Sequence, residues 1–560
     1  MWFFLRSQLT VALFCGAAGA VFAGGGPQNV ALVVNPHDPE SLEVANVYAE
    51  LREISGINVV YLPWPMDVRA TSGTAFRDRI LSPILTELNR RGIREQIDYI
   101  TFSCGFPYLV NCESQYPEKE FAKTARPMTS ITSAAFNYDA MLHNRSAMFG
   151  GEVNQYFRPG VATSASFQGS RGWRGGESTA AGGEKYLLAT ALGVSLEKGN
   201  TVAEIVTSLR RSKESDKANY PGTIYYMRNH DIRSQVRHDT FADAVEELNS
   251  IGVKATTLSG TAPHNKPDVA GLTTGASHLQ LRSSGSTILP GALIDNLTSA
   301  GGRMHAGTEL NPQTTIGDFI RRGAAGASGA VVEPYAIAAK FPSAALHVHY
   351  ARGCSLAEAF YQSIASPFHL LIVGDPICQP WARPPLVTVE SDKELIDIAG
   401  SIQLTPAATY PDQRQASRFE FYIDGVRAST NDPGESFTID STRLADGWHK
   451  FRVVAVDDTA IRVQGAWTAD VQVKNGRDAM QLVIGRRKYA ISDMIEIQAA
   501  STQPGKISIL QLGRVLGTVS PGERTSIDAK TIGRGVITLW GEQEGASTLR
   551  SRPLTLEILQ

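Results

Sequence analysis

The spacing of apolar residues divides the chain into an α/β part and an all-β part. Between residues 29 and 381, short apolar runs alternate with segments whose apolar residues recur at helical spacing. From residue 384 onward, apolar and polar residues alternate along short runs that end at turns. The first pattern predicts parallel strands connected by helices, and the second predicts β-sandwich domains.

The first half of the α/β part is predicted over residues 28–222. Its predicted strands are 29–35, 57–62 and 97–102. Asp38 and Pro39 suit the N-cap and the first position of a helix that follows the first strand. This β-α-β-α-β order is typical of a parallel, doubly wound sheet. Residues 104–180 are rich in Gly, Ser and Thr without a regular period, so we expect either a functional insertion or a poorly ordered loop there.

The second half is predicted over residues 223–383. Its predicted strands are 223–227, 253–258, 277–281, 287–297, 329–332 and 369–373. The last strand is an apolar run that stops at Gly374-Asp375-Pro376, which is typical of a buried parallel strand. Open α/β folds bind their ligands at the carboxyl ends of such strands, so we expect functional residues there.

Two all-β domains are predicted after the α/β part, over residues 384–475 and 476–560. Alternating runs in the first of them are 418–425, 448–456 and 467–473. The stretch LADGWHKFRVVAVD resembles immunoglobulin-like modules of bacterial surface proteins. We therefore expect an immunoglobulin-like sandwich followed by a smaller β-domain.

The first 23 residues have the pattern of an export signal. Arg6 supplies a positive charge, and residues 9–22 form an apolar stretch that is too short to span a bilayer. Val21-Phe22-Ala23 places small residues where a signal peptidase reads them, which predicts cleavage before Gly24. No later segment has the length of a membrane span, so we expect a secreted or periplasmic protein without one.

Charge and cysteine content narrow the picture further. The formal net charge is −2, and no basic run argues for nucleic acid as a partner. Cys15 would leave with the signal, which leaves four cysteines in an oxidising compartment. The candidate disulfides are Cys104–Cys112 and Cys354–Cys378, and the alternative is four buried thiols.

Common cofactor and metal signatures are absent from the sequence. There is no G-x-S-x-G elbow, H-E-x-x-H motif, P-loop or G-x-G-x-x-G turn. His347 and His349 would share one face of a strand and could bind zinc with Glu333 or Asp375, whereas on a helix they would diverge. We therefore expect neither a cofactor nor a metal.

Three stretches carry a family resemblance: NVALVVNPHDPESLEVANVYAELR, ILPGALIDNLTS and the block 320–381. Over residues 28–382 the chain resembles a family of secreted bacterial proteins that occurs in genomes with exosortase-type protein sorting. That family implies no particular activity. More distantly, the closing strand with Gly374-Asp375-Pro376 resembles the last strand of gingipain-like, caspase-fold cysteine peptidases. This second resemblance implies a caspase-like α/β domain with doubly wound sheets in two halves.

The peptidase resemblance also implies a catalytic dyad, with a His after the third strand of the second half and a Cys after the fourth. No His directly follows the predicted third strand, 277–281, and Ser299 stands where the Cys would be. The dyad is therefore predicted to be missing. Ser299 could still act as a nucleophile with His305 or His278 as its base, and Cys104 is an alternative nucleophile as a free thiol.

Four further residues are candidates for a binding pocket. Gly301 and Gly302 offer flexible backbone amides that suit an anion or a carbonyl group. Glu333 and Asp375 each follow a predicted strand, and we expect them to face the same edge of the sheet.

Three functions remain open on this evidence. The chain could be an exported protein whose catalytically degenerate peptidase-like domain binds a peptide, a protein or an envelope polymer. It could be an active peptidase or other hydrolase that uses Ser299 or Cys104. It could also be a structural surface protein that binds through its β-sandwich domains.

Overall fold

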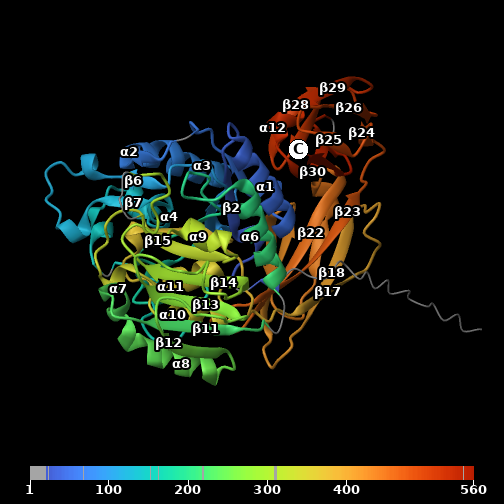
Figure 1. The fold of residues 1–560 in the computed structure, drawn as a ribbon. Coiled ribbons are helices and arrows are strands. Elements are labelled where there is room, and N and C mark those ends of the chain that lie inside the picture. The colour runs from blue at the N-terminus through green and yellow to red at the C-terminus, as the bar shows by residue number, and fades with distance from the viewer. Residues whose placement is uncertain are drawn as a thin grey trace, which may run out of the picture.

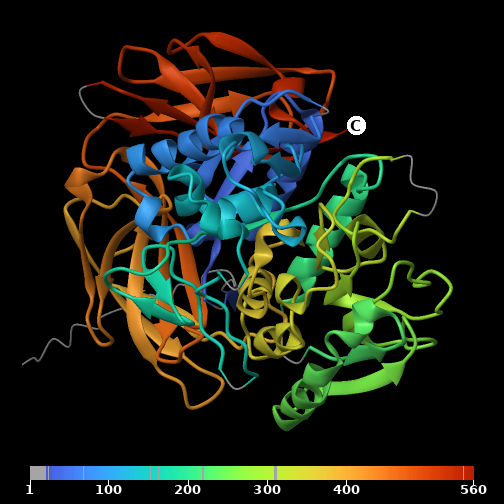
Figure 2. The same ribbon diagram turned by 90° about the vertical axis from the view of Figure 1, so that its left-hand side faces the viewer.

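The computed structural model describes most of the chain. The described residues are 21–22, 24–66, 68–151, 153–161, 163–216, 220–307, 312–545 and 548–559. The predicted signal peptide lies outside them, apart from the two-residue strand β1 (Val21–Phe22). Figures 1 and 2 show an α/β domain with two β-domains (orange and red) lying beside its first half (blue). The strands labelled β11 and β12 (green) lie at the other side of the α/β domain.

A ten-stranded sheet forms the centre of the α/β domain. Its strands are β2 (Val30–Val34), β3 (Val59–Tyr61), β5 (Tyr99–Phe102), β10 (Leu188–Ala191), β11 (Thr223–Arg228), β12 (Lys254–Ser259), β13 (Val269–Gly275), β14 (Ile288–Leu297), β15 (Gly326–Ala330) and β16 (Leu370–Gly374). Their order across the sheet is β12-β11-β13-β14-β15-β16-β10-β5-β2-β3. Every neighbouring pair is parallel except β15 and β16.

The prediction of a mixed α/β domain is confirmed, but one of its strands was misplaced. Residues 277–281 form no strand, and the third strand of the second half is β13, residues 269–275. All seven residues of β13 are buried, so the strand has no alternation of apolar and polar residues. The sequence VAGLTTG hides such a strand because small and hydroxyl-bearing residues fill it.

Helices cover both faces of the sheet. One apolar cluster packs under α1 (Pro39–Arg52), α6 (Val202–Ser215), α10 (Ala345–Ala351) and α11 (Leu356–Ser363). The other packs under α3 (Ser82–Arg90), α4 (Ile131–Phe136) and α9 (Ile316–Arg321). The sheet is therefore buried on both sides, which is the arrangement that a parallel sheet requires.

Hydroxyl groups at the start of α4 fill the junction between β10 and β16. These two strands pair only at Ala191 and Val373. The Leu370 carbonyl accepts hydrogen bonds from Ser130 Oγ at 2.5 Å and Ser133 Oγ at 2.8 Å. These side chains satisfy a backbone group that strand pairing leaves open in the buried sheet.

The prediction of β-sandwich domains is also confirmed. In the first sandwich, β17 (Leu386–Ser391), β18 (Ser401–Thr409) and β21 (Phe437–Asp440) face β19 (Ala416–Ile423), β22 (Asp446–Asp457) and β23 (Gln464–Val473). In the second, β24 (Met480–Ile484), β26 (Met494–Ser501) and β29 (Arg524–Asp528) face β27 (Ile507–Gln511), β28 (Arg514–Val519), β30 (Gly535–Gln543) and β32 (Leu554–Leu559). Each sandwich encloses its own apolar core.

The second sandwich is tied to helix α1 by a polar contact. Asn46 donates to the carbonyls of Ile532 and Arg534, at 3.0 Å each. Its side-chain oxygen accepts from Gln511 Nε2 at 2.8 Å. The same helix therefore contacts the sheet on one side and the C-terminal domain on the other.

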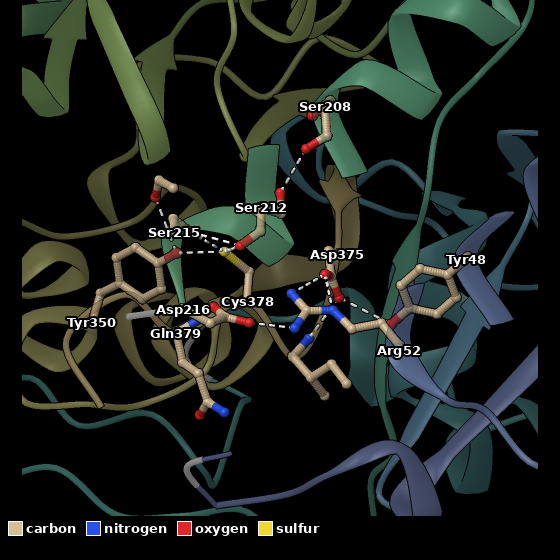
Figure 3. A network of polar contacts seen from close by, with 12 residues as sticks. Tyr48, Arg52, Ser208, Ser212, Ser215, Asp216, Tyr350, Asp375, Cys378 and Gln379 are labelled. Atoms are coloured by element: carbon tan, nitrogen blue, oxygen red, sulfur yellow. Dashed lines mark hydrogen bonds and ion pairs between the residues drawn. The ribbon is translucent and has the colours of Figure 1, made fainter. Parts of the chain in front are cut away.

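A buried arginine joins three distant segments inside the α/β domain (Figure 3). Arg52, the last residue of α1, is 1% exposed. Its guanidinium forms ion pairs with Asp216, which caps α6, and with Asp375, which follows β16. Tyr48 donates to Asp375 at 2.9 Å. Burial raises the pKa of Asp216, and the charge of Arg52 opposes that rise.

Replacing this arginine should destabilise the protein strongly. In Arg52→Leu, two buried carboxylates would lose their shared cation, and we expect a loss of about 3–5 kcal/mol in the free energy of unfolding. Urea unfolding followed by circular dichroism measures it. Arg90→Leu is the matched control, because Arg90 forms an exposed ion pair with Glu87 and should change the midpoint little. Equal midpoints for the two variants would contradict the role assigned to Arg52.

Candidate functional site

The predicted site residues Glu333 and Asp375 lie at opposite edges of the sheet. Strands β15 and β16 are antiparallel, with Gly326 opposite Gly374 and Ala330 opposite Leu370. The end of β16 therefore lies beside the start of β15, far from the end that leads to Glu333. The expectation that both residues face one pocket is wrong. Asp375 is 1% exposed and belongs to the Arg52 network instead.

The glycine pair after β14 serves packing. The Gly302 amide donates to the Ala330 carbonyl at 2.9 Å. A Cβ atom on Gly302 would lie 2.2 Å from the Gly329 carbonyl oxygen, and one on Gly329 would lie 2.5 Å from the carbonyl carbon of Gly301. Gly301 and Gly302 thus allow the loop to lie against β15. The Gly302 amide is not available for an anion or a carbonyl group.

Ser299 lies half-buried in the same loop. The following amide, that of Ala300, donates to Gln313 Oε1 at 3.0 Å. His278 is the third residue after β13, so a histidine does stand after the third strand, contrary to the prediction. It is exposed, and its Nδ1 lies 2.9 Å from Ser277 Oγ. Within the described residues, no hydrogen bond joins His278 to Ser299.

His305 contacts the first half of the domain. Its Nδ1 is hydrogen-bonded to the Tyr108 hydroxyl, and the two rings lie 6.0 Å apart. Burial lowers the pKa of His305, and the nearby charge of Arg69 adds to this effect. The described residues show no contact that would make His305 the base for Ser299.

Cys104 lines a cavity at the carboxyl edge of the first half. The cavity holds about 310 Å³ and lies beyond the ends of β2, β5 and β10. Its walls include the polar residues Asp38, Glu40, Cys104, Tyr108 and Ser195, and the apolar residues Met66, Phe102, Phe106, Ile131 and Leu196. The chain continues from β2 to β3 on one side and from β5 to β10 on the other. The boundary between β2 and β5 is therefore a topological switch point, where open α/β sheets bind ligands.

Asn35, the residue after β2, fixes the loops around this cavity. Its Nδ2 donates to the carbonyl of Trp64 at 3.0 Å and to that of Gly105 at 3.2 Å. Its side-chain oxygen accepts from the amides of His37 and Trp64, at 3.1 and 3.2 Å. One buried amide therefore holds together the loops that follow three neighbouring strands.

The contact between Gly105 and Asp38 requires glycine. Gly105 has φ +72°, and a Cβ atom there would lie 2.0 Å from Asp38 Oδ2. Asp38 caps α1 by accepting from the Glu40 amide at 2.9 Å. The cavity wall is thus built from a helix start and a tight turn that touch each other.

The thiol of Cys104 is protonated in this setting. The residue is 3% exposed, and burial, reinforced by the charge of Asp38, raises the pKa of the thiol well above its usual range. A thiol nucleophile needs a lowered pKa and a neighbouring base. The electrostatics of the cavity therefore oppose a nucleophilic role for Cys104. Its thiol can serve as a weak hydrogen-bonding group in the cavity wall.

A second cavity, of about 510 Å³, lies beyond the end of β15. Glu333 lines it together with Lys119, Lys123 and Arg126 from the long insertion. Arg126 forms an exposed ion pair with Glu113, so one of these cations already has a partner. Glu333 is thus a cavity residue, although it lies apart from Cys104 and Asp375.

The four described cysteines are free and buried, and the predicted disulfides do not form. Cys104 and Cys112 belong to apolar clusters on opposite faces of the sheet. Cys354 Sγ accepts from Gln362 Nε2 at 3.4 Å, while Cys378 Sγ lies 3.2 Å from the Tyr350 hydroxyl. Each sulfur is therefore packed or hydrogen-bonded in its own environment.

The zinc alternative for His347 and His349 also fails. Both residues lie on helix α10, where their side chains diverge. His347 Nε2 lies 3.1 Å from Thr273 Oγ1, and His349 Nδ1 lies 2.8 Å from Ser164 Oγ. Burial lowers the pKa of both imidazoles to about 3, so they are neutral core residues.

Sequence reasoning named Cys104 because it follows a strand, and it placed Asp38 only as a helix cap. It missed Asn35, Tyr108 and Ser195. Asn35 could have been recognised by the same rule, since it ends the first apolar run. Tyr108 and Ser195 have no comparable signal, because loops bring them to the cavity.

Comparisons with known proteins give only partial matches with low scores. No family model and no curated protein matches the chain. Fibronectin(III)-like modules of CbhA from Clostridium thermocellum match with 19% identity over 31% of this chain and 93% of theirs, with a TM-score of 0.14. The mixed-linkage glucan protein SGBP-B of Bacteroides ovatus matches with 13% identity over 30% of this chain and 42% of its own, with a TM-score of 0.19.

Latent PorU from Porphyromonas gingivalis matches with 14% identity over 29% of this chain and 19% of its own, with a TM-score of 0.13. These scores are too low to transfer a function. Among the described helices, none has the length and apolar character needed to cross a membrane.

Thiol titration tests the state of the cysteines. A chain that begins at Gly24 should react with Ellman's reagent at all four cysteines after unfolding in urea, without prior reduction, because the structure has no disulfide among them. In the folded protein, burial and raised pKa values should make the reaction slow. A reduced sample is the control. A count that rises after reduction would reveal a disulfide and contradict the structure.

Proposed function

We propose that this protein is an exported binding protein whose α/β domain has a peptidase-like fold without a working peptidase site. The observation that carries the proposal is the state of the loop after β14. Two amides of that loop, which could otherwise hold an oxyanion, are already used, since Ala300 donates to Gln313 and Gly302 donates to Ala330. A hydrolase of this type needs such donors to be free and aimed at the reacting atom.

The strand order supports the kinship with gingipain-like peptidases. The order β12-β11-β13-β14-β15-β16 has five parallel strands and a sixth that is antiparallel. The first half adds the parallel strands β10-β5-β2-β3. We infer a caspase-like second half joined to a four-stranded first half, in agreement with the resemblance of the closing strand and its Gly374-Asp375-Pro376 turn.

We propose the Cys104 cavity as the binding site. Its apolar walls suit a hydrophobic group, and the carboxylates of Asp38 and Glu40 suit a cation or a hydrogen-bond donor next to that group. A peptide segment or polymer with an apolar group beside an amine has this chemistry. The two sandwich domains would accompany the α/β domain that contains this site, either at the cell envelope or in the secreted protein.

Peptide retention tests the binding site. The purified chain is mixed with a diverse peptide library, separated by gel filtration and analysed by mass spectrometry. We expect retained peptides that pair an apolar side chain with a nearby amine. Ser195→Trp fills the cavity and should abolish retention, whereas Ser250→Trp, on an exposed helix end, should not. Equal retention by both variants, or none by the unmodified chain, would contradict the proposed site.

The same mixture tests for hydrolysis. We expect no new cleavage products, because two amides of the loop after β14 are engaged and no described hydrogen bond joins Ser299 to a histidine. Ser299→Ala, His278→Ala and Cys104→Ala run in parallel. Cleavage that disappears in one of these variants would identify a working hydrolase and its nucleophile or base, and would overturn the degenerate-site proposal.

A further inference from the structure

Glu358 is a buried carboxylate that lacks a cation. It lies on α11 and is 0% exposed. Its two oxygens accept from backbone amides, those of Phe167 and Ser355, at 2.8 Å each. Among the described lysines, arginines and histidines, none forms an ion pair with it. Burial raises the pKa of Glu358 to about 7, although the hydrogen bonds from Ser355 and Phe167 oppose that rise.

Among the described residues, the ionisable groups around Glu358 are acidic or neutral. Tyr99, Tyr156 and Cys354 face it from the neighbouring elements, and all three are neutral groups with raised pKa values. Asp98 lies close enough for Glu358 to contribute to raising its pKa to about 7, mainly through burial. An additional positive charge would therefore stabilise this region.

Gly24 lies directly against this carboxylate. A Cβ atom on Gly24 would lie 2.0 Å from Glu358 Oε1 and 2.7 Å from Oε2. The Gly24 nitrogen is bonded to the same Cα, so it is within reach of the carboxylate. The Gly24 carbonyl accepts from Gln464 Nε2 at 3.3 Å, and Gln28 Nε2 donates to Gln464 Oε1 at 2.9 Å. The segment is thus held in place by the first sandwich.

We propose that removal of the export signal supplies the missing cation. Cleavage of the Ala23–Gly24 bond would give Gly24 a free α-ammonium group, which would form a buried ion pair with Glu358. Water provides the hydroxyl group for the Ala23 carboxyl and one hydrogen for the Gly24 nitrogen, and the amine then takes a proton from solvent. This inference rests on the export part of the proposed function and not on its ligand.

Such an ion pair would couple processing to stability. The unprocessed chain carries a neutral amide at Gly24 and keeps Glu358 unpaired. It also pairs β1 with β23 through Val21 and Phe22, opposite Gly465 and Gln464. Cleavage releases that short strand and replaces it with a charge pair inside the α/β domain. A buried pair contributes when additional hydrogen bonds satisfy its groups, and the two backbone amides at Glu358 do so.

The first measurement is the N-terminus of the protein after export, by intact-mass and N-terminal peptide analysis. We expect Gly24. Two chains are then prepared, one that begins at Gly24 and one that keeps Val21-Phe22-Ala23. Glu358→Gln is made in both. Glutamine can keep the capping bond to the Ser355 amide, but its Nε2 cannot accept from the Phe167 amide. Both chains lose that bond equally, so the difference between them reports the charge.

Glu358→Gln should lower the melting temperature of the Gly24 chain by several degrees more than that of the extended chain, because only the Gly24 chain loses an ion pair. Glu204→Gln is the matched control, because Glu204 occupies the same capping position on α6 and should shift both chains equally. An equal effect of Glu358→Gln in the two chains would overturn the ion pair. A different N-terminus would overturn it together with the predicted signal, while peptide retention would still test the ligand site separately.

A chemical probe covers the case in which Glu358→Gln fails to fold. The α-amine of the unsubstituted Gly24 chain is acetylated with N-hydroxysuccinimidyl acetate, and mass spectrometry gives the rate. A buried, paired ammonium should react many-fold more slowly in the folded chain than in urea. A rate in the folded chain that equals the rate in urea would show an exposed amine and refute the pairing.

Discussion

The Arg52 guanidinium is the constraint on which the arrangement of the α/β domain depends. A cation with 1% exposure is tolerated only if opposite charges reach it, and here they come from Asp216 and Asp375. These residues lie 164 and 323 positions away along the chain. The network therefore forms only when the end of α1, the end of α6 and the turn after β16 meet. Because α1 also begins at the Cys104 cavity, the same helix links the network to the candidate site.

Strand and helix periodicity identified most elements of the fold, and it failed where burial removes periodicity. The helix after the first strand begins at Pro39 with Asp38 as its cap, as its capping residues predict. The closing strand was found for a similar reason, because Gly374 and Pro376 end its apolar run. Strand β13 was missed because a strand buried on both faces shows no alternation.

The direction of β16 explains the largest error about the site. A final strand that follows a helix reads as one more parallel strand, and parallel strands would bring Glu333 and Asp375 to one edge. Direction depends on which neighbour the strand pairs with, and that choice is made by tertiary packing. Here the backbone pairs β16 with β15 along five residue pairs, while Ser130 and Ser133 fill its junction with β10. Local sequence does not encode that choice.

Two details of the Cys104 cavity decide between binding and thiol chemistry. A helix start lowers the pKa of a nearby thiol when its amides and positive dipole end are free. In this protein Asp38 caps the start of α1 and Glu40 occupies its first turn. Their two negative charges offset the positive end of the helix dipole near Cys104. Both carboxylates raise the pKa of the thiol. If Cys104 lay beside an uncapped helix start, its thiol would be favoured as a nucleophile. With Asp38 and Glu40 in place, the cavity instead favours binding of a ligand that carries a hydrogen-bond donor.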